Sequence, residues 1–160
     1  MISILFVCHG NICRSPMAES IFTHLVQVSG LDSQFFVSSA ATSSEEIGSP
    51  PYPAAVRQLQ RCGVPVVPHR AVRLRREDYD QYDLLLAMDS ENLRGILRIT
   101  GQDPEDKVRR LLDLSSRPRD IADPWYSGDF ETAYRDILEG CTALLARFTD
   151  QQPGRDPRSS

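Results

Sequence analysis

Near the N-terminus, a strand, a short loop and a helix are predicted to follow one another directly. The apolar run Ile4–Val7 is typical of a buried strand, and Ser15 with Pro16 is typical of the start of a helix. Cys8 and Arg14 stand at the two ends of the loop between them. Because such a passage directs backbone N–H groups toward one point, the chain is expected to fold around a site for a phosphate-like anion.

The two end residues of this loop indicate its chemistry. The planar guanidinium of Arg14 can donate to two phosphate oxygens at once. The same positive field favours the thiolate of Cys8, which makes this sulfur a nucleophile at neutral pH. We therefore interpret the loop as a site where Cys8 attacks a bound phosphate ester, the alternative being a buried structural thiol.

A second cysteine–arginine pair with the same spacing provides an internal comparison. Cys141 and Arg147 lie in a segment whose apolar residues recur with the period of one helix face, at positions 130, 134, 137, 141, 144 and 148. Side chains six residues apart on a helix do not meet. We therefore expect Cys141 to be a core residue and Arg147 to be solvated.

Composition limits the classes of function. The chain has 160 residues, a net charge of −4 and a pI near 5.3, which gives no support to nucleic-acid binding. No apolar stretch reaches the length of a membrane span, and the N-terminus lacks the basic start and cleavage site of a signal peptide. A cytoplasmic protein with no membrane partner and with reduced cysteines is expected.

Apolar runs and helical periods alternate along the chain. Strands are expected at residues 2–7, 34–39, 83–88 and 108–112, helices at 16–28, 53–62, 90–98 and 130–148, and long loops at 40–51, 64–76 and 120–129. This alternation predicts a Rossmann-like, three-layer α/β sandwich with a four-stranded parallel sheet and helices on both faces. One domain is expected at residues 1–150, followed by a disordered tail at 151–160.

The expected topology places the site at one edge of the sheet. In a parallel sheet, ligands bind beyond the carboxyl ends of the strands, and Cys8 follows the first expected strand. The loops after Ser39 and Met88, and the loop that contains Asp123, are candidates to line the same site. Taken alone, Asp123 before a proline is more typical of a turn than of a catalytic group.

Together these residues resemble the low-molecular-weight protein tyrosine phosphatases. The resemblance spans about residues 1–148 and is carried by Val7–Pro16, Asp123–Tyr126, Ser39–Ser43, Gly63–Pro65, His69 and Met88–Arg94. It implies metal-independent hydrolysis of phosphate monoesters, with no cofactor. Phosphotyrosine-containing proteins are the implied substrates, and inorganic phosphate is the implied product and inhibitor.

The resemblance also implies the role of each site residue. Cys8 is the nucleophile, Arg14 the phosphate clamp, and Asp123 the general acid that protonates the leaving phenolate oxygen and then activates water. The phosphate-binding loop comprises His9, Gly10, Asn11, Ile12, Cys13, Arg14 and Ser15.

Four residues are expected to support that loop through hydrogen bonds: Asn11, Ser15, Ser39 and His69. Ser15 also fits the N-cap of a helix, and it can serve both purposes. His9 is expected at the rim, where it contributes mainly its backbone N–H.

Two pairs of residues are expected to form the walls of the cleft. Trp125 and Tyr126 would form an aromatic slot that favours a phenyl ring, although ordinary core packing is equally compatible with these residues. Glu45 and Glu46 make the opposite rim acidic, which could weaken the binding of acidic phosphopeptides. This acidic rim leaves the substrate preference open.

Other functions on the same fold remain as alternatives. Protein arginine phosphatases typically carry Thr where this chain has Ile12, and arsenate reductases need two further cysteines close together, whereas Cys62 and Cys141 lie far apart in the sequence. A non-catalytic phosphate-binding module is the third alternative, but it would need neither a nucleophile nor an acid.

Cys13 suggests redox control. It lies five residues after Cys8, and an activated thiolate is readily oxidised. We hypothesise that mild peroxide forms a reversible Cys8–Cys13 disulfide, the alternative being that Cys13 packs beneath the loop. A metal site made of Cys8, His9 and Cys13 is not expected, because the loop amides point inward toward an anion.

Overall fold

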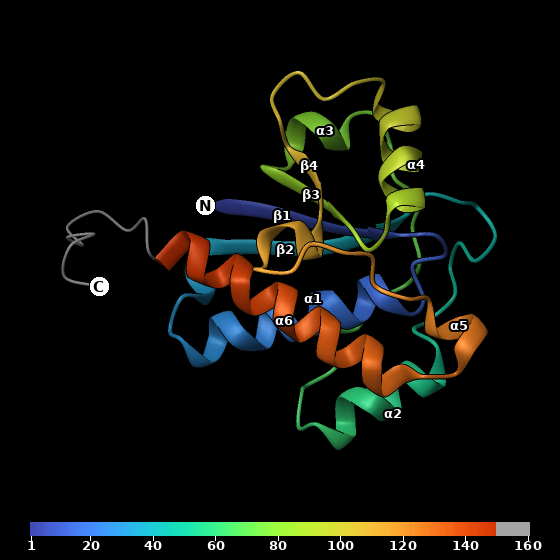
Figure 1. The fold of residues 1–160 in the computed structure, drawn as a ribbon, viewed down its shortest axis with the longest axis vertical. Helices are drawn as coiled ribbons and strands as arrows, with labels where there is room; N and C mark the ends of the chain where they lie inside the picture. Colours follow the sequence, from blue (N-terminus) through green and yellow to red (C-terminus); the bar gives the residue numbers. More distant parts are fainter. Residues whose placement is uncertain (150–160) are drawn as a thin grey trace.

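The predicted strands form a parallel sheet. The computed structural model describes residues 1–149, and the expected tail at 151–160 lies outside the described residues. The strands are ordered β2–β1–β3–β4 (Figure 1). Their bounds are Ile2–Cys8 for β1, Phe35–Ala41 for β2, Leu84–Ala87 for β3 and Val108–Arg110 for β4. Because the pairings between neighbouring strands are parallel, the carboxyl ends of the strands meet at one edge of the sheet.

Helices cover both faces of this sheet, which confirms the predicted three-layer α/β fold. On one face lie α1 (Arg14–Val28), α2 (Pro53–Arg61) and α6 (Phe130–Thr149), which pack against one another. On the other face lie α3 (Asp78–Gln81) and α4 (Ser90–Thr100), as Figure 1 shows.

The alternation of side chains along β1 decides which face receives the reactive sulfur. Ile4, Phe6 and Cys8 belong to the core beneath α1 and α6. Leu5 and Val7 belong to the separate core beneath α4. Successive side chains of a strand point to opposite faces, so the last residue of β1 presents its thiol on the side of α1.

The N-terminus of α1 differs from the prediction. The helix begins at Arg14, and Cys13 rather than Ser15 occupies the N-cap position without a side-chain capping hydrogen bond. The expectation that Ser15 caps the helix is therefore wrong. Because Ser15 lies within the first turn, its hydroxyl points into the loop instead.

Two expected strand boundaries are also corrected. Strand β2 continues through Ala41, because Ala41 pairs with Cys8 where a loop was expected. Leu111 and Leu112 belong to a 3₁₀ helix (η2, Leu111–Leu114) instead of a strand. Both side chains pack in the core on the face of α6, and consecutive strand residues could not do so.

The expected loop at 120–129 contains a short helix, α5 (Pro124–Ser127), with Asp123 as its N-cap. Proline at the first helical position and an aspartate before it are a common start for a helix. Helix α3 was also not predicted.

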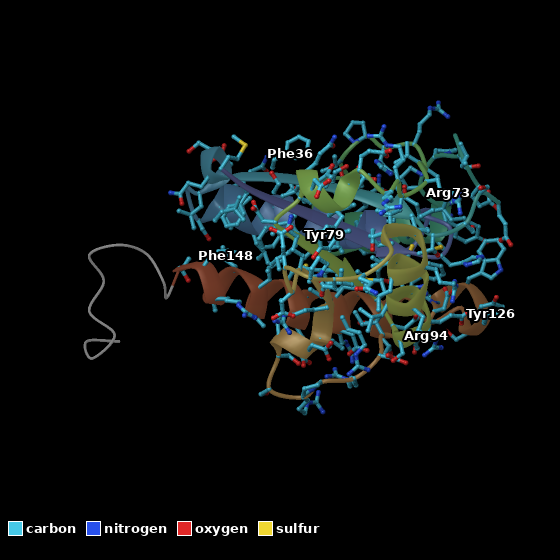
Figure 2. The ribbon with its side chains drawn as sticks, turned by 90° about the horizontal axis from the view of Figure 1, so that it is seen from above. Phe36, Arg73, Tyr79, Arg94, Tyr126 and Phe148 are labelled. Carbon is cyan, nitrogen blue, oxygen red and sulfur yellow. The ribbon has the colours of Figure 1, made fainter. Side chains whose placement is uncertain are left out.

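Figure 2 shows Tyr126 of α5 at one end of the molecule and Phe148 of α6 at the other.

The internal comparison in α6 agrees with the prediction. Cys141 is fully buried and Arg147 is exposed, so the side chains of the second cysteine–arginine pair do not meet.

Among the described residues, no helix is long and apolar enough to cross a membrane.

Candidate active site

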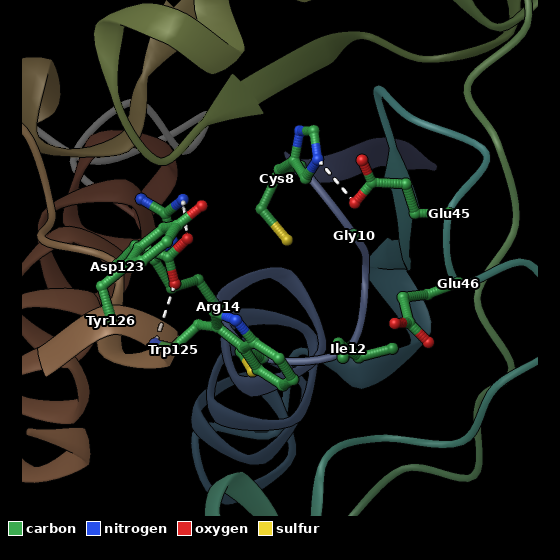
Figure 3. A pocket seen from close by; sticks show the side chains of 11 residues that line it. Cys8, Gly10, Ile12, Arg14, Glu45, Glu46, Asp123, Trp125 and Tyr126 are labelled. Atoms are coloured by element: carbon green, nitrogen blue, oxygen red, sulfur yellow. Dashed lines mark hydrogen bonds and ion pairs between the residues drawn. The ribbon is translucent and has the colours of Figure 1, made fainter. Parts of the chain in front are cut away.

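A hollow of about 120 Å³ opens at the carboxyl end of β1 (Figure 3). Its lining combines the loop after β1, the segment after β2 and the start of α5. The lining residues are Cys8, His9, Gly10, Ile12, Cys13, Arg14, Glu45, Glu46, Asp123, Trp125 and Tyr126. Residues from three distant parts of the sequence, all predicted for the site, therefore meet at one place.

The sulfur of Cys8 sits among hydrogen-bond donors. The backbone N–H of Asn11 donates to Cys8 Sγ at 3.3 Å, and the Ser15 hydroxyl lies 3.0 Å from the same sulfur. Cys8 itself is 4 % exposed. The Asn11 N–H and the Ser15 hydroxyl therefore both lie within hydrogen-bonding distance of the buried sulfur.

Asn11 holds the loop in its shape. Its backbone has φ of 60°, in the left-handed region that asparagine tolerates better than most residues. The side-chain Nδ2 donates to Ser15 Oγ at 2.8 Å and to Ser39 Oγ at 2.9 Å. Its Oδ1 accepts from the N–H of Val72 at 3.1 Å and lies 2.6 Å from His69 Nε2. The structure thus brings together the four residues expected to support the loop.

Glu19 completes this network and was not predicted from the sequence. Ser39 Oγ donates to Glu19 Oε1 at 2.6 Å, and Glu19 is only 5 % exposed. Burial raises the pKa of Glu19 to about 7, although the bond from Ser39 acts in the opposite direction. A signal was available, because Glu19 lies four residues after Ser15 and therefore on the same side of the expected helix.

Glu19 and His69 form a contact between groups that resist ionisation. His69 Nδ1 lies 3.5 Å from Glu19 Oε1, which is within ion-pair distance. Burial lowers the pKa of His69 while it raises that of Glu19, so both shifts favour the neutral forms. We therefore regard the pair as part of a neutral hydrogen-bonding layer beneath the loop rather than as a salt bridge.

Arg14 is fixed from one side by a carboxylate and by a backbone carbonyl. Its Nη1 donates to Asp89 Oδ2 and to the carbonyl of Ile121, each at 2.7 Å. Burial acts to lower the pKa of Arg14, but the neighbouring Cys8 sulfur and Asp89 outweigh it and raise the pKa. The guanidinium therefore stays charged with its fork held beside the hollow.

Asp89 has two roles. Its Oδ1 accepts from the N–H of Asn92 at 2.7 Å and caps α4, while Oδ2 binds Arg14. The second role could not be read from the sequence, because the two residues are 75 positions apart.

Asp123 lines the hollow from the segment that precedes α5. Its Oδ2 lies 3.5 Å from Arg14 Nη2, and its side chain is 26 % exposed. Its Oδ1 accepts from the N–H of Trp125 at 3.1 Å, which caps α5. Asp123 therefore caps the short helix with one carboxylate oxygen and faces the site with the other.

The walls of the hollow differ in chemistry. Figure 3 shows Trp125 and Tyr126 on the side of Asp123, and Glu45 and Glu46 across from them. Trp125 is 51 % and Tyr126 85 % exposed, so neither is an ordinary core residue. Tyr52 meets the Trp125 ring edge-on with centroids 5.0 Å apart and thereby supports the aromatic wall.

The acidic rim is tied to the loop. Glu45 Oε2 lies 3.1 Å from His9 Nε2, and both side chains are largely exposed. His9 therefore lies at the rim, as predicted.

The remaining cysteines have different surroundings. Cys13 is a buried residue of the loop, and burial followed by the proximity of Cys8 raises its pKa to about 12. Burial also raises the pKa of Cys141, whereas Cys62 is exposed. Within residues 1–149, no three His, Cys, Asp or Glu side chains gather as a metal site would require.

Comparisons with known proteins agree with this geometry. A model of the family described as low molecular weight phosphotyrosine protein phosphatase matches residues 3–153. The chain is 40% identical over 154 residues to the low molecular weight protein-tyrosine-phosphatase YfkJ of Bacillus subtilis, covering 95% of this chain and 99% of that protein. It is 40% identical to the human low molecular weight phosphotyrosine protein phosphatase, covering 91% and 94% of the two chains.

Solved structures show the same fold. The crystal structure of YfkJ matches with a TM-score of 0.90 and 39% identity, covering 95% of this chain and 98% of that chain. The structure of a drosophila arginine phosphatase matches with a TM-score of 0.83 and 30% identity, covering 93% and 99%.

Proposed function

The chain belongs to the low molecular weight phosphotyrosine protein phosphatase family and is a protein tyrosine phosphatase, and we propose that Cys8, Arg14 and Asp123 carry its chemistry. The observation that supports this assignment is the convergence of a sulfur, a guanidinium and a carboxylate on one hollow. Its substrates are phosphotyrosine-containing proteins. We place the enzyme in the cytoplasm, because all four cysteines are free thiols.

In the first step, the thiolate of Cys8 attacks phosphorus and the bond from phosphorus to the tyrosine oxygen breaks. Protonated Asp123 gives its proton to that oxygen, so tyrosine leaves as a neutral phenol. The guanidinium of Arg14 and the loop amides stabilise the charge on the other phosphate oxygens. The product of this step is phosphocysteine at Cys8.

In the second step, the carboxylate of Asp123 takes a proton from water. The water oxygen attacks phosphorus and the bond from sulfur to phosphorus breaks, which returns the electron pair to Cys8. Inorganic phosphate is released, and Asp123 is again protonated. Because phosphate fits the same loop, it should also inhibit.

The walls of the hollow set the substrate preference. Trp125 and Tyr126 offer a flat apolar surface to a phenyl ring, which a short phosphoserine side chain cannot reach. Glu45 and Glu46 place negative charge at the opposite rim. Acidic residues that contact this rim should therefore weaken the binding of a phosphopeptide.

Cys13 is proposed as the redox partner of Cys8. Peroxide converts the Cys8 thiolate to a sulfenic acid with release of water or hydroxide. The Cys13 thiol then attacks that sulfur, a second water leaves and a disulfide forms, which an external thiol reduces. Burial raises the pKa of Cys13 to about 12, so at neutral pH its sulfur enters this step as the thiol.

The assignment is tested by hydrolysis of para-nitrophenyl phosphate in the presence of a chelator, with wild type beside Cys8→Ser. We expect activity that survives the chelator and disappears in the variant while phosphate binding is kept. Retention of the ester without turnover by reduced wild type would instead indicate a binding module.

A parallel assay with phosphotyrosine peptide, phosphoarginine peptide and arsenate separates the enzymes that share this fold. We expect the phosphotyrosine peptide to be preferred, because Ile12 lines the hollow where an arginine phosphatase typically has threonine. Preference for phosphoarginine, or reduction of arsenate, would overturn the assignment of the substrate.

A further inference from the structure

The segment that carries Asp123 is anchored to the rest of the protein by its own side chains. We call residues 117–123 the acid loop. Asp120, three positions before Asp123, accepts three hydrogen bonds on one oxygen. These come from the N–H of Ser90, from its hydroxyl and from Arg110 Nη1, each at 2.9 Å.

The Arg110 guanidinium is itself oriented before it reaches the acid loop. Asp113 Oδ1 accepts from Nε at 3.0 Å and from Nη2 at 2.8 Å, so this paired contact fixes the plane of the guanidinium. The Nη1 group is then left to point at Asp120. Bonds from Arg110 and Ser90 lower the pKa of Asp120 although burial acts to raise it, so the anchor is charged at neutral pH.

The neighbouring residue is tied to a different element. Arg119 donates to Asp136 at 2.9 Å and to Glu139 at 3.0 Å, and both carboxylates belong to α6. Consecutive side chains thus hold the acid loop to α4 and β4 on one side and to α6 on the other.

The backbone of the loop connects these anchors to the phosphate clamp. The N–H of Ile121 donates to the carbonyl of Met88 at 2.9 Å, and its own carbonyl accepts from Arg14. Residues 120–121 therefore lie two residues before Asp123 along the chain and contact Arg14 directly, so we expect a shift of their backbone to affect both groups.

We propose that Asp120, held by Ser90 and Arg110, is a positioning residue that fixes the Asp123 carboxyl beside the leaving oxygen. This inference rests on the proposed role of Asp123 as the acid. The Asp120 side chain is 50% exposed, and an exposed ion pair contributes only about 0–1 kcal/mol to stability. A contribution to geometry explains three hydrogen bonds on one exposed carboxylate oxygen better than a contribution to stability.

The test compares kcat/KM for phenyl phosphate and for 2,4-dinitrophenyl phosphate in Asp120→Ala. In a two-step mechanism kcat/KM reports only the first step, and only the poor phenolate leaving group needs the proton. We expect about a tenfold loss on phenyl phosphate and a loss below about twofold on the activated ester. Asp120→Asn keeps an acceptor for Ser90 and should restore most of the loss.

The double variant with Asp123→Asn shows whether Asp120 acts through the acid. In that background Asp120→Ala should cost less than about twofold on phenyl phosphate, since there is no proton left to position. Asp106→Asn is the control, because it removes the negative charge that Arg109 of β4 contacts at 2.6 Å without touching the acid loop.

Three results would overturn the inference. These are equal losses on both esters, a full tenfold loss in the Asp123→Asn background, or no loss in Asp120→Ala while Asp123→Asn alone is strongly selective for phenyl phosphate. If the loss of kcat/KM in Asp123→Asn does not depend on the leaving group, Asp123 is not the general acid, and the inference about Asp120 is wrong for that reason.

Discussion

At the scale of single residues, the four cysteines of the chain have different surroundings and therefore different chemical roles. Cys8 is surrounded by donors, Cys13 is buried beside it, Cys62 is exposed and Cys141 lies in the core. Reactivity should follow these surroundings rather than the number of thiols.

Replacement of Cys13 tests the proposed redox control. Wild type treated with mild peroxide should lose activity and regain most of it on addition of dithiothreitol, because the disulfide protects the Cys8 sulfur from further oxidation. Cys13→Ser should lose activity irreversibly under the same treatment. Cys62→Ser is the control and should recover like wild type. Equal recovery of Cys13→Ser and wild type would remove Cys13 from this role.

The reactive residues could be predicted because they lie in one short segment. Cys8, Arg14 and Ser15 follow one another within a single loop and first helical turn. The contacts of Glu19 with Ser39 and of Asp89 with Arg14 could not, since their partners are 20 and 75 positions away. Asp123 entered only through the family resemblance, because an aspartate before proline is common in turns.

At the scale of elements, α6 and the 3₁₀ helix η2 are packed without spare room. A Cβ atom built on Gly140 of α6 would clash with Leu111 Cγ, because the two carbon atoms would be far closer than carbon atoms approach. This close contact follows from the two consecutive leucines of η2, which the sequence pattern had suggested as part of a strand.

Gly140→Ala should therefore destabilise the protein by about 1–3 kcal/mol, the usual cost of overpacking. In an exposed helix the same change would stabilise by about 1 kcal/mol, so the sign of the effect is diagnostic. The free energy of unfolding in urea measures it. Thr142→Ala, at an exposed position of α6, is the control and should change stability by less than about 0.5 kcal/mol. A Gly140→Ala variant as stable as wild type would contradict the packing described here.

At the scale of the whole molecule, the strand order β2–β1–β3–β4 brings the phosphate loop, the acid loop and the acidic rim to one edge of the sheet. Alternating periods in the sequence were sufficient to predict a four-stranded parallel sheet, but not the order of its strands. They were not sufficient for α5 and α3, because a helix of four residues makes only about one turn and its pattern does not repeat.

Protonation of the buried layer couples the site to global stability. The folded state keeps the Glu19 proton up to pH about 7, whereas the unfolded chain releases it near 4.5. The unfolded state therefore binds fewer protons in this window, and the Glu19 contribution to stability falls as pH rises. Burial lowers the pKa of His69, so its contribution rises with pH up to about 6.5 and partly cancels that slope.

Comparison of Glu19→Gln with wild type isolates the first effect. The difference in the free energy of unfolding should shift in favour of the variant between pH 4.5 and 7, by at most about 3 kcal/mol, and become constant above pH 7. Urea unfolding at pH 5, 6 and 7.5 gives this difference. A difference that does not depend on pH would mean that Glu19 is ionised throughout.

The central claim is that catalysis proceeds through phosphate bound covalently to Cys8. The most direct measurement is to quench wild-type enzyme with an alkaline denaturant during turnover of a radiolabelled phosphotyrosine peptide, and to locate the label by peptide mapping. We expect the label on Cys8 in wild type and no label in Cys8→Ser. Label on another residue, such as His9, or turnover with no labelled enzyme at any quench time, would contradict the mechanism.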